Sequence, residues 1–432
     1  MNHNKQDAIY DVKKLGTGKT LVLGLQHMFA MFGATVLVPL LTGLDVSTTL
    51  LFAGVGTLLF HFVTKKKVPA FLGSSFAFLG GYAAIAPLLA DGSSNVEMIP
   101  YACFGVACAG LLYLVMAALI KVFSAEKIMK FFPPIVTGPI IIAIGLTLSK
   151  SAIDSCSSNW IIALAAIAVV IFCNIYGKGM IKIVPILIGV IVSYVVGIAM
   201  GEVDFTAVKE AAWFGVPIHK EMTVLALFGE NFDPALLITA VITIMPIAFA
   251  TIVEHIGDIS AISSTTGRNY IKEPGLHRTL LGDGFATILA SLFGAPANTT
   301  YGENTGVLNL SKVYDPFVVR LAAVFAIIFS FCPKFAAVIQ AMPTATVGGI
   351  SLILYGMISA VGVRNIVENQ VDFTKTRNVI IAALILVLSI GINYSAAGCI
   401  AFQVGSITIS LSGLAVGALA GIILNAILPE DK

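Results

Sequence analysis

Charged residues are scarce in this sequence. Of its 432 residues, 25 are Lys or Arg and 23 are Asp or Glu, so only 11% of the chain is charged, whereas soluble proteins carry about 25%. Hydrophobic residues make up 58%, and apolar runs long enough to cross a bilayer recur from near residue 20 to the C-terminus. This composition excludes a soluble enzyme and any large domain outside a membrane. We expect a polytopic membrane protein.

Motifs for several chemistries are also missing. The six cysteines form no C-x-x-C pair and most lie inside apolar runs, so we expect neither a disulfide nor a metal site. The patterns G-x-S-x-G and H-E-x-x-H do not occur, which argues against an intramembrane protease. Residues 16–20 imitate the end of a Walker A loop, but Lys13 stands where that motif needs a glycine. No basic patch indicates nucleic-acid binding. Because no catalytic motif occurs, we also expect no enzyme activity and no cofactor.

The apolar runs divide into fourteen segments when those interrupted by Gly and Pro are split. In the first half they begin near Leu21, Val46, Val68, Pro100, Ile135, Trp160 and Ile183, and in the second near Pro234, Leu276, Thr299, Pro316, Thr344, Arg377 and Phe402. Isolated strands cannot cross a bilayer, so these segments predict an all-α membrane protein.

Lys and Arg are unevenly distributed among the loops. With the N-terminus placed inside, the outer loops hold Lys150, Lys209, Lys220 and Lys334, and all other basic residues lie inside. This distribution follows the positive-inside rule. Because an odd number of segments would put the tail outside and disturb the pattern, the consistent topology has fourteen segments and both termini in the cytoplasm.

Landmarks in the first half of the chain recur in the second. Gln26-His27 in the first segment corresponds to Glu254-His255 in the eighth, and residues 74–76 in the third correspond to residues 299–301 in the tenth. Each repeat holds seven segments, an odd number, so the two halves cross the membrane in opposite directions. The sequence therefore predicts a 7+7 inverted repeat, an architecture of secondary transporters.

The third and tenth segments are interrupted at equivalent places. Residues 69–78 and 296–303 each start with proline and are rich in Gly, Ser, Thr and aromatic residues. We interpret both as short extended stretches that lead into half-helices. Non-helical backbone persists at membrane depth only where it is buried in protein or lines a cavity, and its N–H groups can hold a polar ligand there. A kink or re-entrant loop without a ligand is the alternative, and the recurrence in both halves favours a binding site.

Three acidic residues fall within the apolar segments. Glu254 and Asp258 are four residues apart on one face of the eighth segment, and Glu303 begins the half-helix of the tenth. A carboxylate within a membrane is costly unless it is protonated or paired, so such residues mark ion or substrate pathways. For Asp258 the alternative is a position at the cytoplasmic helix end, beside Arg268.

Three further polar residues lie in the same segments. A single histidine on a helix more often bonds to a neighbouring helix than carries a proton, so we expect structural roles for His27 and His255. We expect Asn304 to brace the broken tenth segment.

At these residues the sequence resembles the nucleobase–ascorbate transporter family, also called nucleobase–cation symporter 2, and most closely its bacterial uracil permease branch. The resemblance covers almost the whole chain and is carried by residues 26–35, 73–78, 254–258, 274–278 and 298–304. The family signature Q/E-N-x-G-x4-S/T-R/K/G is met by residues 303–306 followed by Ser311-Lys312. Purine carriers of the family typically have Gln where Glu303 stands, so this residue favours uracil.

The resemblance implies an arrangement of the fourteen segments in two domains. A core domain would comprise segments 1–4 and 8–11, in residues 1–123 and 233–342. A gate domain would comprise segments 5–7 and 12–14, in residues 124–232 and 343–432. Short antiparallel strands of segments 3 and 10 would hold the substrate between the domains.

The resemblance also implies which residues contact the substrate. Glu254 and Glu303 would accept hydrogen bonds from the N–H groups of uracil, and the backbone N–H groups of Phe76 and Gly302 would donate to its carbonyls. The pocket would further be lined by Ala34, Ser75, Tyr301 and Tyr355.

Glu254 is the residue we expect to link proton movement to substrate, with Asp258 one helical turn away as a second coupling residue. Desolvation raises the pKa of a carboxyl group toward the range in which proton coupling works. Some uracil carriers have His at the position of Asp258, so a coupling role of that His does not transfer to this chain unchanged.

The function expected from these observations is import of uracil by proton symport across a bacterial plasma membrane, with the core moving against the gate. The expected partners are uracil, protons, membrane lipid and a second copy bound through the gate domains. One alternative is a xanthine or urate carrier of the same family. Another is a channel, which predicts flux far above carrier rates and no accumulation against a gradient.

Overall fold

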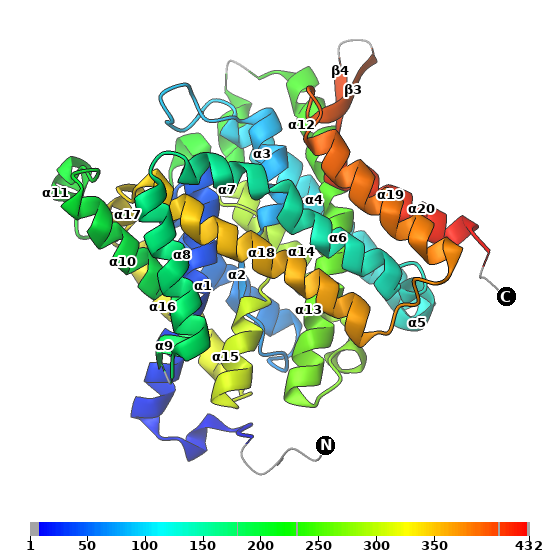
Figure 1. The fold of residues 1–432 in the computed structure, drawn as a ribbon, viewed down its shortest axis with the longest axis horizontal. Helices are drawn as coiled ribbons and strands as arrows, with labels where there is room; N and C mark the ends of the chain where they lie inside the picture. The colour runs from blue at the N-terminus through cyan, green and yellow to red at the C-terminus, as the bar shows by residue number, and fades with distance from the viewer. Residues whose placement is uncertain (1–7, 179, 230–231, 405–406, 430–432) are drawn as a thin grey trace.

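The computed structural model describes residues 8–178, 180–229, 232–404 and 407–429, and the side chains of Ala34 and Glu303 lie outside the described part. Helices make up most of the described chain (Figure 1). Its strands form two antiparallel pairs, β1 (Leu72–Ser74) with β2 (Asn298–Thr300) and β3 (Cys399–Val404) with β4 (Ile407–Ser412). The all-α class with short strands in segments 3 and 10 is thus confirmed.

Within the described ranges, seven helical stretches are long and apolar enough to span a membrane. They are α1 (Thr17–Thr42), α2 (Val46–Val63), α4 (Ile99–Phe123), α6 with α7 (Pro134–Thr147, Ser149–Cys156), α12 with α13 (Pro234–Ile244, Ala248–Thr266), α18 (Thr344–Glu368) and α19 (Thr376–Asn393). Helices α16 (Pro316–Ser330) and α17 (Pro333–Gln340) are together long and apolar enough for an eighth, but they are bent by 88° at the break between them, as in a broken span or a re-entrant loop. The protein therefore crosses the membrane several times.

The remaining helices are shorter. Three of them are apolar, α8 (Trp160–Tyr176), α10 (Pro185–Ala199) and α20 (Gly413–Ile427), as is the stretch Phe76–Ile85. Helix α14 (Leu276–Leu292) is of similar length and carries His277, Arg278 and Asp283. The two half-helices, α3 (Leu79–Ile85) and α15 (Glu303–Ser311), follow strands β1 and β2. Short connecting helices are α5 (Ala125–Met129), α9 (Met180–Ile183) and α11 (Thr206–Glu210). Each of the fourteen predicted segments has a counterpart among these elements.

The fourteenth segment begins later than expected. We predicted a start near Phe402, but α20 begins at Gly413, and the residues before it form the β3–β4 hairpin. The prediction was wrong because apolar and polar residues alternate strictly from Ile407 to Ser412. This period of two suits a strand, and counting the run by its mean hydropathy hides it.

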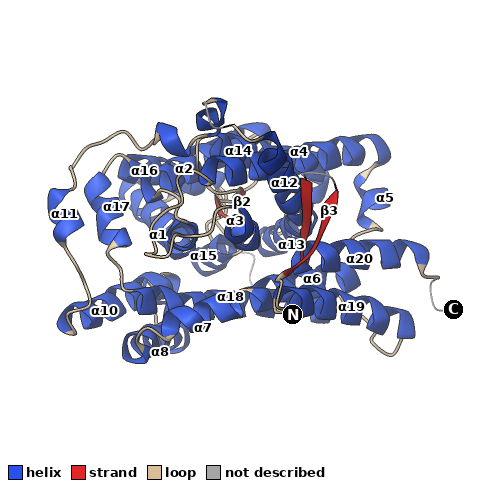
Figure 2. Cartoon of the chain, turned by 90° about the horizontal axis from the view of Figure 1, so that it is seen from above, coloured by secondary structure: helices blue, strands red, loops and turns tan. Residues whose placement is uncertain are grey.

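The helices form two bundles, which Figure 2 shows from above. The first contains α1, α2, α4, α12, α14 and α16, together with the half-helices and α13; the second contains α6, α7, α8, α10, α18, α19 and α20. Each bundle combines elements from both halves of the chain, so the two repeats are intertwined. Any site between the bundles is consequently built by residues distant in sequence.

The two ends of the molecule differ in what they carry. The N-terminal segment and the C-terminal ends of α13 and α15 lie at one end, which we call the N-terminal face, whereas the β3–β4 hairpin lies at the opposite end (Figure 1).

Candidate binding site at the broken helices

Strands β1 and β2 meet in the interior of the first bundle. Leu72 is paired with Thr300, Gly73 with Thr299 and Ser74 with Asn298, in antiparallel register. The ladder continues beyond the strands, because the N–H of Ser75 donates to Ala297 O at 2.9 Å and the N–H of Tyr301 donates to Phe71 O at 2.9 Å. The extended backbone of each broken segment thus satisfies its polar groups with the other, as a membrane interior requires.

Two threonines hold the strands in equivalent ways. On α2, Thr57 Oγ1 accepts from the N–H of Leu72 at 2.9 Å and donates to Leu72 O at 3.2 Å. On α14, Thr287 Oγ1 donates to Asn298 O at 2.8 Å. Because α2 and α14 are the second helices of the two repeats, the same residue type performs the same task in each half.

Tyr301 locks the two strands together. Its hydroxyl donates to Ser74 O at 2.8 Å, and Thr35 Oγ1 on α1 lies 3.4 Å from it. The ring passes so close to β1 that a Cβ on Gly73 would lie 2.6 Å from it. Glycine at position 73 is therefore required by this approach, which explains its place in the motif.

A cavity of about 700 Å³ lies between the bundles beside this strand pair. From the first bundle it is lined by residues that include Ser75, Phe76, Glu254, Asp258, Tyr301, Gly302 and Thr305, and from the second by residues that include Phe132, Thr137, Met357, Val361 and Asn369. Phe132, Met357 and Val361 present an apolar wall opposite the carboxyl groups. The cavity thus combines a polar side on the first bundle with a mostly apolar side on the second, as small-molecule sites do.

Asp258 adjoins the backbone of the second broken segment. A Cβ on Gly302 would lie 3.0 Å from Asp258 Oδ1, so the carboxyl group rests against the turn between β2 and α15. Asp258 is buried, and it shares the cavity wall with Glu254 one helical turn earlier on α13. The two acids that we predicted on one helical face therefore do face one cavity.

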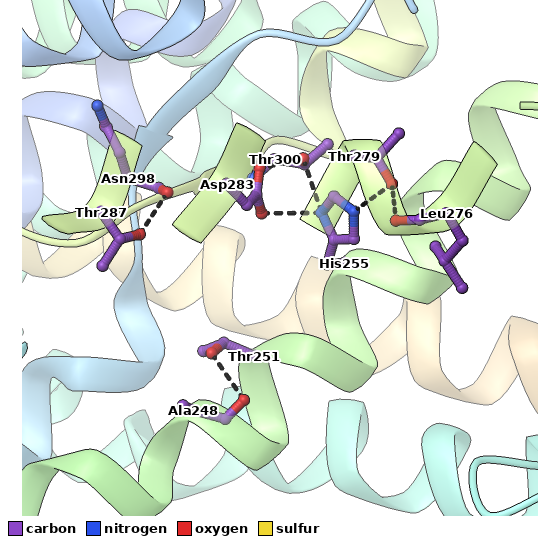
Figure 3. Close-up of polar contacts among 9 residues, drawn as sticks. All are labelled: Ala248, Thr251, His255, Leu276, Thr279, Asp283, Thr287, Asn298 and Thr300. Carbon is purple, nitrogen blue, oxygen red and sulfur yellow. Dashed lines mark hydrogen bonds and ion pairs between the residues drawn. The ribbon is translucent and has the colours of Figure 1, made fainter. Parts of the chain in front are cut away.

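His255 points toward α14 and β2 instead. Its Nδ1 lies 2.8 Å from Asp283 Oδ2 and 3.1 Å from Thr300 Oγ1, and its Nε2 lies 2.9 Å from Thr279 Oγ1 (Figure 3). Thr279 donates its own hydroxyl to Leu276 O at 3.0 Å, and the carboxylate of Asp283 can only accept. Both ring nitrogens of His255 are thus held by polar groups of α14 and β2.

Asp283 is the functional residue that we missed. We predicted three acids within the apolar segments, but Asp283 on α14 is a fourth and is completely buried. It accepts from the hydroxyl of Thr300 at 2.9 Å and from the N–H of Thr300 at 3.3 Å, so it anchors β2 directly. Its position between two glycines in an otherwise apolar segment was the available signal.

His27 and Asn304 lie next to each other. The side-chain amide of Asn304 lies 3.3 Å from His27 Nδ1 and donates to His27 O at 3.2 Å, and both residues are buried. This contact joins α1 to the beginning of α15. It therefore fixes the start of α15 to the first bundle, next to strand β2.

The remaining predicted residues have different placements. Tyr355 on α18 packs edge-on against the Phe76 ring, with 5.4 Å between centroids, and so contacts the site from the second bundle. The side chains of Ala34 and Glu303 lie outside the described part of the structure. In the part of the chain that the structure describes, no cluster of three or more His, Cys, Asp or Glu side chains could hold a metal ion.

The arrangement of the chain matches that of a solved transporter. The transmembrane domain of a cyanobacterium bicarbonate transporter, BicA, aligns with 97% of this chain and 99% of its own length, with a TM-score of 0.61 and 15% sequence identity. At this identity the likeness concerns the fold. The protein is thus a polytopic membrane protein with the 7+7 inverted-repeat fold that this transporter has.

Sequence comparison gives the family. Residues 18–398 match the profile of the Permease family. The uracil permease of Bacillus caldolyticus is 41% identical over 424 residues, covering 95% of this chain and 92% of the relative, and that of Bacillus subtilis strain 168 is 38% identical over 421 residues, covering 94% and 92%. The chain belongs to this permease family, the nucleobase–ascorbate transporters, which confirms the resemblance. Its relatives are named as permeases and not as enzymes.

The His255–Asp283 pair gives a prediction for stability. Replacing Asp283 by Ala removes the acceptor for His255 and for both donors of Thr300, so the free energy of unfolding should fall by about 3–5 kcal/mol, as when one partner of a buried ion pair is removed. Asp154→Ala is the control, because Asp154 pairs with Lys150 at 2.6 Å on an exposed surface and should change stability by less than about 1 kcal/mol. Thermal unfolding in detergent micelles measures both, and equal melting temperatures would contradict the anchoring role of Asp283.

Proposed function

We propose that this protein imports uracil across a bacterial plasma membrane by proton symport. The observation that carries the proposal is the pair Glu254 and Asp258, which face a cavity between two bundles beside an interrupted strand pair. Membership of the permease family, with relatives named uracil permease, supports uracil as the substrate.

The chemistry of uracil suits the polar side of the cavity. Uracil has two N–H donors and two carbonyl acceptors. Glu254 would accept from one N–H and Glu303 from the other, while the backbone N–H groups of Phe76 and Gly302 would donate to the carbonyls. Ala34, Ser75, Tyr301 and Tyr355 would surround the ring. A flat ring between polar groups on one side and apolar groups on the other explains why both bundles contribute.

Transport would proceed by alternating access. In this proposal the first bundle is the core domain, residues 1–123 and 233–342, and the second is the gate domain, residues 124–232 and 343–432. The cavity lining runs from Phe76 to Asn369 at the end of α18. Both termini would lie in the cytoplasm, in agreement with the distribution of Lys and Arg. A homodimer would form through the gate domains.

Substrate choice is tested by binding. Purified protein in detergent should bind uracil in isothermal titration calorimetry, and an excess of xanthine should leave the uracil isotherm unchanged, because Glu303 replaces the Gln of the family's purine carriers. Binding of xanthine with displacement of uracil would instead identify a purine carrier. Absence of uracil binding by well-folded protein would contradict the proposal.

The coupling role of Glu254 has its own test. Glu254→Gln preserves volume but removes the titrating group and one acceptor, so uracil affinity should fall roughly ten- to hundredfold. The residual binding, measured from about pH 5 to pH 8, should lose the pH dependence that coupling between proton and substrate gives the wild type. Asp258→Asn is the matched comparison and should flatten the profile less. An unchanged pH profile in Glu254→Gln would remove this residue from the coupling mechanism.

A further inference from the structure

The N-terminal segment before α1 is bound to the folded core. Ile9 forms a parallel β-bridge with Val313: its N–H donates to Lys312 O at 2.9 Å, and its carbonyl accepts from the N–H of Tyr314 at 2.7 Å. Three residues later, the N–H of Val12 donates to Asp315 Oδ2 at 3.0 Å. The segment thus follows the linker that connects α15 with α16.

Tyr10 extends from this segment to a second element. Its hydroxyl donates to Thr266 O, the last residue of α13, at 2.7 Å. The guanidinium of Arg268 lies 4.3 Å above its ring, and the Tyr314 ring lies 5.4 Å away on the linker after α15. One side chain therefore contacts both the end of α13 and the linker that leaves α15.

These two helices carry the acids of the proposed site. Glu254 and Asp258 belong to α13, and α15 begins with Glu303. Near the site, His255 Nδ1 on α13 lies 3.1 Å from Thr300 Oγ1 on β2, the strand that leads into α15. Farther along, both line the cavity, α13 with Ser260 and Thr265 and α15 with Thr305 and Asn309. A further fixed point between them lies at their C-terminal ends.

The N-terminal segment supplies that fixed point at the far end of the pair. A helix is stiff over the few turns that separate Thr266 from Glu254. A change in the angle between α13 and α15 at the N-terminal face consequently changes the distance between their first turns. Contacts far from a ligand alter its affinity in this way when they bias the geometry of the element that holds it.

We propose that residues 8–15 form a strap that fixes α13 relative to α15, and that Tyr10 is a positioning residue for substrate binding. The strap acts through the helices and does not touch the substrate. This inference rests on the proposed function for the identity of the ligand, uracil, while the tie between the helices rests on the contacts alone.

Substitution of Tyr10 tests the strap. About 40% of the Tyr10 side chain is exposed, so Tyr10→Ala leaves no buried void and should fold. It should raise the uracil dissociation constant roughly fivefold or more, the lower end of coupling between separate sites. Tyr10→Phe keeps the ring contacts with Arg268 and Tyr314 and should restore most of the affinity. Tyr176→Ala, which removes an exposed tyrosine at the end of α8, is the control and should bind uracil as the wild type does.

Hydrogen exchange gives a readout that does not involve the ligand. The N–H of Arg268 donates to Ser263 O at 3.2 Å, and exchange of this amide should accelerate in Tyr10→Ala and not in Tyr176→Ala. Faster exchange together with weaker uracil binding supports the proposal. Unchanged affinity in Tyr10→Ala, with or without faster exchange, overturns it, as does an equal loss in Tyr176→Ala. If the wild type itself binds no uracil, the proposed function fails, while the exchange result still tests the tie between the helices.

Discussion

The pairing of β1 with β2 is the interaction on which the rest of the site depends. Membrane interiors offer no water to unpaired backbone, so a broken segment alone would be unstable at that depth. Two broken segments of opposite direction can satisfy each other, and here they do so through Leu72, Gly73 and Ser74 against Thr300, Thr299 and Asn298. The inverted repeat therefore explains both why two helical segments are interrupted and how the backbone groups of each are paired with those of the other.

This constraint explains why so many polar residues lie behind the strands. Thr57, Thr287 and Asp283 bind strand backbone from α2 and α14, while Tyr301 crosses from one strand to the other. These side chains hold the half-helices in place, and of the four only Tyr301 also lines the cavity. Glu254 and Asp258 line the cavity, while His255 anchors the same helix through another face. On α13, the residue that anchors the helix and the residues that line the cavity thus lie on different faces.

Much of this organisation could be predicted from the sequence, and the exceptions share a cause. Long apolar runs predicted twelve of the segments, with the start of the fourteenth placed too early, and the repeated Ser/Thr-aromatic motifs predicted the two broken ones. The β3–β4 hairpin was missed because the alternation from Ile407 to Ser412 is short. Asp283 was missed because its partners, His255 and Thr300, belong to other segments. The contacts of Tyr10 were missed because a polar segment before the first span resembles a solvated tail, and only folding brings Thr266 and Tyr314 to it.

The central claim is that the cavity between the bundles is a transport site driven by protons. Uptake of radiolabelled uracil into proteoliposomes tests it most directly, with an inwardly directed proton gradient imposed or absent. The account predicts that uracil accumulates above its external concentration only with the gradient, and that a protonophore abolishes the accumulation. Uptake that equilibrates without accumulation under the gradient, at rates far above those of a carrier, would contradict it and identify a channel.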